Sequence, residues 1–189
     1  MFWPVILPMQ ITLLGMIGVN VVAVLIAPKL KWRRPRVFAW SILLGVLGFV
    51  PSCTAVQLVA DQFRFGAFSY PDHESINDFR VQRFLPDAAT DITVQKQSDR
   101  FRARFKIDES SLDEWFEKYW DYAEKHSIDG RHEKRTVSAE AFARQFSGLD
   151  WVLPDEAVEY ICPHAGNGAG GTIWYSRADG IAFEYAGYW

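Results

Sequence analysis

Few residues of this chain could do chemistry by their type and spacing, and the nearest pair is Cys162 and His164, with Pro163 between them. An imidazolium beside a cysteine favours the thiolate, which is the nucleophilic form of the side chain. Proline restricts the backbone between the two, and no third group that could orient the imidazole is evident. We therefore consider Cys162 and His164 as a candidate reactive pair. The competing interpretation is a buried, inert cysteine.

Two other patterns invite a chemical interpretation. His126, His132 and His164 have carboxylates nearby, but a metal-binding spacing such as His-Glu-x-x-His is missing. The glycine-rich run at 166–171 lacks the Gly-Lys-Ser/Thr ending of a phosphate-binding loop, and strand-like residues follow it. The sequence therefore predicts no metal, no cofactor and no established catalytic residue, and it places a loop at 166–171.

A basic row occupies alternate positions of one expected strand, at Arg102, Arg104 and Lys106. It could contact an acidic partner surface or anionic lipid headgroups, or pair across the sheet with acids such as Glu184. Residues 61–189 hold 15 Lys and Arg against 23 Asp and Glu, a formal balance of −8. Because phosphate neutralisation needs an excess of basic residues, we expect no nucleic-acid partner.

A small domain at 85–189 must position these residues. Apolar and polar residues alternate at 90–96 and again at 101–107, which predicts a hairpin with its turn at 97–99. A second hairpin is predicted at 172–188, around the Asp-Gly pair at 179–180.

Two helices are expected between the hairpins. Ser111 and Glu114 form a capping-box signature, and apolar residues recur at helical spacing from there to Ala123. A shorter helix is predicted to start after Ser138 and to run through Phe142 and Phe146 to a stop at Gly148. Strands, helices and then strands indicate an α+β domain with an antiparallel sheet and two helices.

The first 60 residues contain no Asp or Glu and include two apolar runs, 1–28 and 37–60. Each offers the roughly 20 apolar residues that a helix needs to span a bilayer, so 1–60 is predicted to be a transmembrane helical hairpin. The loop at 29–36 carries five Lys and Arg. Such loops stay in the cytoplasm, which places everything after Asp61 outside it. The segment 61–84 shows no sustained period and is expected to be a juxtamembrane connector.

Small and polar residues indicate how the spans pack. Ser41, Gly45 and Gly48 lie where another backbone could approach one face of the second span. Asn20 lies inside the first span, where an amide needs a partner, so it should face the second helix or another membrane protein. Both a self-contained hairpin and docking to a larger assembly stay open.

A lipoprotein anchor is the alternative for this region. Basic residues and an apolar stretch precede Val50-Pro51-Ser52-Cys53, which places Cys53 where a lipidated cysteine would stand. Pro51 fits that pattern poorly. With only two cysteines in the chain, a disulfide scaffold is not expected.

The stretch Leu85-Pro86-Asp87-Ala88-Ala89-Thr90-Asp91-Ile92, with the hairpin and helix after it, resembles a loose group of uncharacterised bacterial membrane-anchored proteins and lipoproteins. The resemblance covers about forty residues and, more weakly, 174–185. It implies an anchored domain and a bacterial source, and it brings no activity, cofactor or catalytic residue.

Together these patterns predict a non-catalytic, membrane-anchored accessory subunit or interaction module of a larger membrane protein assembly. Its partners would be the membrane and other integral membrane subunits. Its location would be the bacterial inner membrane, with the C-terminal domain in the periplasm or outside the cell. The alternative is an anchored enzyme or ligand-binding module that uses Cys162 and His164.

Overall fold

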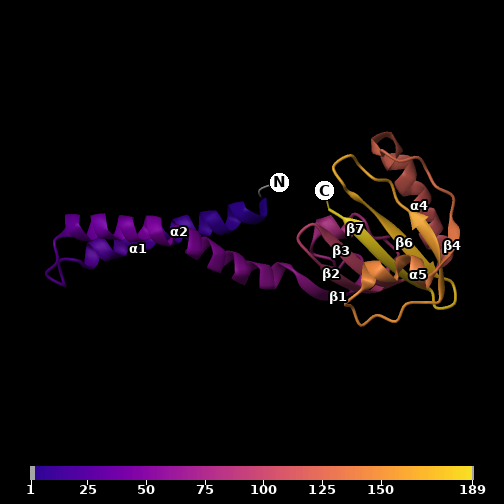
Figure 1. The fold of residues 1–189 in the computed structure, drawn as a ribbon, viewed down its shortest axis with the longest axis horizontal. Helices are drawn as coiled ribbons and strands as arrows, with labels where there is room; N and C mark the ends of the chain where they lie inside the picture. Colours follow the sequence, from indigo (N-terminus) through magenta and orange to yellow (C-terminus); the bar gives the residue numbers. More distant parts are fainter. Residues whose placement is uncertain (1–2, 189) are drawn as a thin grey trace. The chain divides into compact units, whose positions relative to one another are not determined.

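The computed structural model describes residues 3–188 and divides into two compact units, at 1–64 and 65–189 (Figure 1). The first unit is a pair of helices, α1 (Trp3–Ile26) and α2 (Arg34–Arg64), joined by a short turn in which Lys31 has φ +60°. Both are long and apolar enough to cross a bilayer, and most of their large apolar side chains are exposed. The expected loop at 29–36 is shorter in the structure, since α2 begins at Arg34.

The segment 61–84, expected as an irregular connector, contains regular structure. α2 continues to Arg64, and then come strand β1 (Gly66–Asp72) and the short helix α3 (Phe79–Gln82). β1 pairs with β2 along its length, so the sheet begins within the segment assigned to the connector. Pro71 lies in β1, and this proline is tolerated because β1 is an edge strand.

The second unit is built on one seven-stranded antiparallel sheet in the order β1-β2-β3-β7-β6-β5-β4. Besides β1, its strands are β2 (Thr90–Lys96), β3 (Arg100–Lys106), β4 (Arg135–Ser138), β5 (Glu156–Ile161), β6 (Gly170–Ser176) and β7 (Ile181–Gly187). The two predicted hairpins, β2–β3 and β6–β7, are confirmed, as are the α+β class and the antiparallel sheet.

Helices cover both faces of the sheet. The long helix α4 (Glu109–Ala123) packs Leu112, Phe116 and Trp120 into the larger core cluster, together with residues near α3. α5 (Ala139–Phe142) and the 3₁₀ turn η2 (Ala143–Phe146) form a second cluster on the other face with Trp174 and Phe183. Another 3₁₀ turn, η1 (Glu124–His126), follows α4. The residues of β6 therefore face one or the other of two separate cores, which explains the near-continuous burial of this strand.

The helix α4 begins earlier than the capping-box signature indicated. Its N-cap is Asp108, whose carboxylate accepts hydrogen bonds from the backbone N–H and the hydroxyl of Ser111, at 2.8 and 3.0 Å. A carboxylate at this position also interacts favourably with the positive end of the helix dipole. Ser111 is thus a donor inside the first turn, not the cap itself.

Candidate functional site

The helical pair contains a groove between α1 and α2 of about 440 Å³. It is almost entirely apolar, and its walls include Met16 and Asn20 of α1 and Ser41, Gly45, Val46 and Phe49 of α2. Asn20 lies against α2, where its amide donates a 2.6 Å hydrogen bond to the Ser41 hydroxyl. Ser41 in turn donates to the backbone carbonyl of Phe38 at 3.0 Å. We call this feature the hairpin groove.

The glycines of α2 are not used for close contact between the two helices. A Cβ added at Gly45 meets no other atom within 4 Å, and one added at Gly48 only just reaches the Met16 side chain, at 4.0 Å. The helix backbones therefore stay apart on this side. The small-residue face opens the groove instead of closing it, which leaves Gly45 accessible to something outside the pair.

Arg102, Arg104 and Lys106 occupy alternate positions of β3 and so share one face of the sheet, where two of them have partners within the domain. Arg102 reaches over the second core and donates to the carbonyl oxygen of Ser147 at 3.1 Å. Lys106 pairs with Asp91 at 2.9 Å. The suggested pairing with Glu184 does not occur, because Glu184 stands opposite Ala103 and so faces the α4 core, whereas Arg102 points to the other face.

Cys162 and His164 lie in different environments. Cys162 is buried in the α4 core, and desolvation raises the pKa of its thiol well above the usual value. This shift opposes the one that activates a nucleophilic cysteine. The His164 ring is partly exposed, with Nδ1 3.6 Å from a carboxylate oxygen of Asp129. Both cysteines are free, and Cys53 lies within the continuous helix α2.

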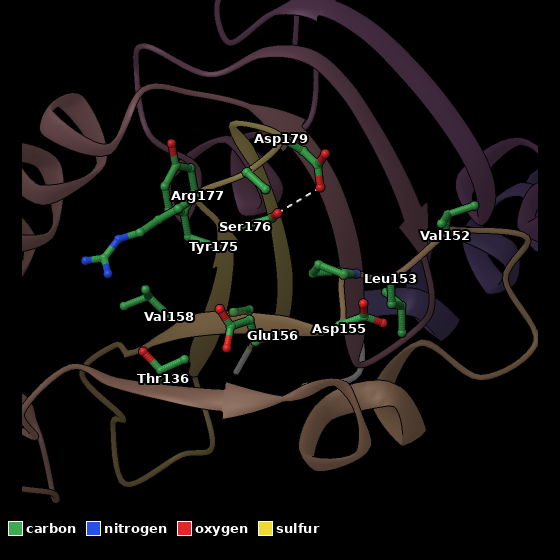
Figure 2. Close-up of a pocket in the computed structure, with 13 residues that line it drawn as sticks. Thr136, Val152, Leu153, Asp155, Glu156, Val158, Tyr175, Ser176, Arg177 and Asp179 are labelled. Carbon is green, nitrogen blue, oxygen red and sulfur yellow. Dashed lines mark hydrogen bonds between the residues drawn. The ribbon is translucent and has the colours of Figure 1, made fainter.

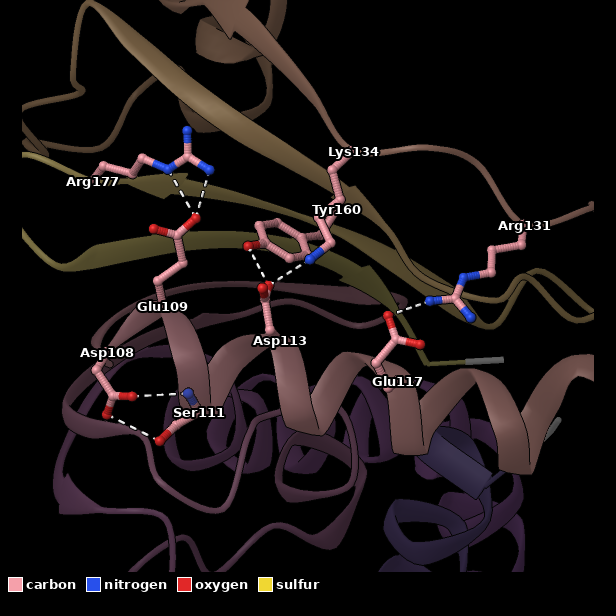
Figure 3. A network of polar contacts seen from close by, with 9 residues as sticks. All are labelled: Asp108, Glu109, Ser111, Asp113, Glu117, Arg131, Lys134, Tyr160 and Arg177. Carbon is pink, nitrogen blue, oxygen red and sulfur yellow. Dashed lines mark hydrogen bonds and ion pairs between the residues drawn. The ribbon is translucent and has the colours of Figure 1, made fainter.

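One flank of α4 carries three carboxylates at four-residue spacing, each held by a basic residue from elsewhere in the domain (Figure 3). Glu109 accepts from Arg177 at 2.6 Å, and Glu117 accepts from Arg131. Between them, Asp113 accepts from both Lys134 and the Tyr160 hydroxyl, each at 2.7 Å. These contacts tie α4 to the β6–β7 turn, to β5 and to the loop before β4.

A surface hollow of about 500 Å³ lies where β5 begins and β6 ends (Figure 2). Its carboxylates are Asp155, Glu156 and Asp179, all on exposed residues. Ser176 donates to Asp179 at 2.8 Å, and the Arg177 side chain points away toward Glu109. Its serine and arginine are therefore already engaged within the domain.

A second hollow, which we call the glycine-loop pocket, measures about 520 Å³ and lies at the other end of the sheet. Its polar side chains include Arg100, Gln145, Glu159, His164, Thr172 and Tyr185, and glycines of the loop before β6 complete it. The sequence indicated His164 and the glycine run but not this pocket. Its residues come from segments that only the sheet order brings together.

Neither a metal site among the described residues nor a match to a known protein assigns a function to this chain. Across residues 3–188, no group of three or more His, Cys, Asp or Glu side chains is placed to hold a metal ion. Comparison with protein-family models, with curated proteins and with solved structures found no match to this chain. The resemblance at 85–92 therefore stays a prediction, and function must be argued from the geometry alone.

Proposed function

We propose that this protein is an integral membrane accessory subunit that docks to an apolar helix of another membrane protein through the hairpin groove. α1 and α2 would anchor it in the bacterial inner membrane. The domain of residues 65–189 would be presented outside the cytoplasm as an interaction or ligand-binding module.

The length and ends of α2 support an anchor. Its 31 residues extend about 46 Å at 1.5 Å per residue, which exceeds the roughly 30 Å of a bilayer's hydrocarbon core. Charged residues stand only at its two ends, with Arg34 and Arg36 at the start and Asp61 and Arg64 at the finish. The apolar middle can therefore lie in lipid while both charged ends reach the headgroups. The basic start favours the cytoplasmic side.

The observation that carries docking is the open space at Gly45. In lipid, helices associate through close packing at small residues and through hydrogen bonds from polar side chains. The hairpin groove offers both, because a Cβ added at Gly45 would meet nothing within 4 Å, and the Asn20 amide donates to the Ser41 hydroxyl inside the groove. An apolar helix from another subunit fits a groove whose lining is almost entirely apolar.

The substitution Gly45→Leu tests the proposal, because Gly45 lines the groove, a Cβ at this position meets no other atom within 4 Å, and the leucine side chain would occupy the groove. The full-length protein is extracted from its native membranes in mild detergent, and its size is measured under native conditions, with mass spectrometry of the proteins that comigrate. We expect the wild type to migrate in a larger assembly and Gly45→Leu to migrate near its own mass. Gly15→Leu is the matched control, since a Cβ added at Gly15 also meets nothing within 4 Å but Gly15 does not line the groove.

Two results would contradict docking through this groove. One is a wild-type protein that migrates alone. The other is an assembly that survives Gly45→Leu as well as it survives Gly15→Leu.

A further inference from the structure

The glycine-loop pocket lies on the α5–η2 face of the sheet. Thr172 of β6 and Arg102 of β3 both stand opposite Tyr185 of β7, so these three side chains share that face. Tyr185 and Thr172 line the pocket, together with Gln145 of η2 and Glu159 of β5. The pocket is thus built mainly on strands, which hold side chains more rigidly than loops do.

Glycines at two positions allow close packing in the wall of the glycine-loop pocket. A Cβ at Gly170 would lie 2.7 Å from Cδ2 of His164, and one at Gly187 would lie 2.7 Å from the carbonyl oxygen of Gly168. Neither distance is tolerable for a real side chain, and Gly170 also has φ +145°. Glycine at these positions lets the His164 ring and the loop backbone pack directly against the end of the sheet.

The charges of the pocket are paired within the domain. Arg100 donates to the Asp99 carboxylate, and this hydrogen bond lowers the pKa of Asp99. Glu159 accepts from the Trp174 indole N–H at 3.1 Å and from Arg135 at 2.6 Å. Each carboxylate therefore has its own cation, so the pocket has little net charge to attract an ion.

Hydrogen-bonding capacity remains after these pairs are made. Neither the Thr172 hydroxyl nor the Gln145 side-chain amide has a hydrogen-bond partner within residues 3–188. The Tyr185 hydroxyl accepts from Arg100 and keeps its own proton free to donate. Donors and acceptors without excess charge therefore converge on one hollow, beside two aromatic side chains, Trp174 and Tyr185.

We propose that the glycine-loop pocket binds a neutral saccharide. Neighbouring hydroxyl groups of a sugar ring both donate and accept, which matches the Thr172, Gln145 and Tyr185 side chains. The volume of about 520 Å³ lies within the usual 300–1,000 Å³ range of small-molecule sites. An anion is disfavoured by the two carboxylates, and a cation would have to displace Arg100 or Arg135. This proposal concerns the domain alone and does not depend on docking in the membrane.

Calorimetric titration of the full-length protein tests the site, with triacetylchitotriose, maltotriose and cellotriose as probes. The detergent must have no sugar headgroup, because a maltoside would compete. We expect saturable binding of at least one trisaccharide and none of N-acetyl-trialanine amide, a neutral peptide of similar size. Thr172→Val, which replaces a hydroxyl by a methyl group, should weaken binding about two- to tenfold, the effect of losing one neutral hydrogen bond.

Thr136→Val is the matched control, because Thr136 lies on β4 outside this pocket. Its affinity should equal that of the wild type. If Thr172→Val does not fold, Tyr185→Phe removes another pocket hydroxyl and should also weaken binding. The proposal is overturned if no trisaccharide binds, if the folded pocket variants bind like the wild type, or if only the peptide binds.

Discussion

Glu184 is a carboxyl group enclosed in the α4 core, with 1% of its surface exposed. Its neighbours across the sheet are Ala103 and Ile173, and its Oε2 has no hydrogen-bond partner within residues 3–188. Desolvation raises its pKa well above the ordinary 4.5. The titratable groups that interact with it are Cys162, on the segment after β5, and Tyr119 of α4. The folded domain therefore holds this carboxyl group protonated where an unfolded chain would ionise it.

This burial makes the stability of the domain depend on pH. Below pH 4.5 the carboxyl is protonated in both states and costs nothing extra. As pH rises above this value, only the unfolded chain releases the proton. The free energy of unfolding therefore falls by about 1.4 kcal/mol for each pH unit until the pH passes the folded pKa. We expect Glu184→Gln to remove this fall and to be more stable than the wild type at pH 7.5 but not at pH 4. Denaturant unfolding followed by near-ultraviolet circular dichroism measures it.

Glu133→Gln, at an exposed loop position, is the control and should keep the wild-type pH dependence. A Glu184→Gln variant with the same pH dependence as the wild type would contradict the burial of this carboxyl group.

The thiol of Cys162 gives a second prediction at the residue scale. Each unit by which burial raises a thiol pKa lowers the thiolate fraction about tenfold, and burial also blocks access. In a Cys53→Ala background, Cys162 should therefore resist iodoacetamide at pH 8 until the protein is unfolded. A cysteine placed at the exposed turn position by Ser98→Cys should react rapidly. Rapid alkylation of native Cys162 would instead support the reactive pair with His164.

At the scale of elements, α4 is fixed by its apolar face and by the carboxylates on one flank. Burial opposes ionisation of Asp113, but hydrogen bonds from Lys134 and Tyr160 outweigh it and lower the pKa of Asp113. Tyr160 is itself buried, and its hydroxyl has Asp113 as its acceptor. The Asp113 contact therefore differs from those of Glu109 and Glu117, because its loss leaves the buried Tyr160 hydroxyl without its acceptor.

Replacing Asp113 by Asn should lower the free energy of unfolding by about 1–2 kcal/mol at pH 7, because a charge-assisted acceptor of Tyr160 is lost in a partly exposed setting. Glu117→Gln breaks the more exposed pair with Arg131 and should cost about 0–1 kcal/mol. Chemical denaturation of both variants measures the difference. Because the folded pKa of Asp113 is lowered, its contribution is present above the unfolded pKa and is lost as pH falls through the folded one. Equal costs for the two variants at pH 7 would remove the special role of Asp113.

The elements that the sequence predicted are those with one buried face or a marked turn. β2 and β3 alternate apolar and polar residues, and β6–β7 turns at Asp179-Gly180. β5 was not predicted from the sequence, because both faces of the sheet are covered there and its burial does not alternate. β1 was not predicted because it contains Pro71. The glycine-loop pocket could not be predicted, because it depends on the order of strands and on Gly170 and Gly187 meeting other segments.

At the scale of the whole molecule, the chain consists of an apolar helical pair and a separate domain that has its own two cores. The basic turn between α1 and α2 should remain in the cytoplasm, which places both ends of the chain on the opposite side. Alkaline phosphatase, which is active only outside the cytoplasm, should therefore be active when fused after Trp189. The same enzyme fused within the turn, after Lys31, should be inactive. The opposite pattern would reverse the assigned compartment.

The most direct test of the central claim is photocrosslinking from the hairpin groove in living cells. A benzophenone amino acid at Val46, which lines the groove, is compared with one at Leu44, which does not; the native side chains are 70% and 65% exposed. We predict a crosslink from position 46 to one discrete membrane protein and none from position 44. Crosslinks to lipid alone from both positions, or the same protein captured from both, would contradict docking through the groove.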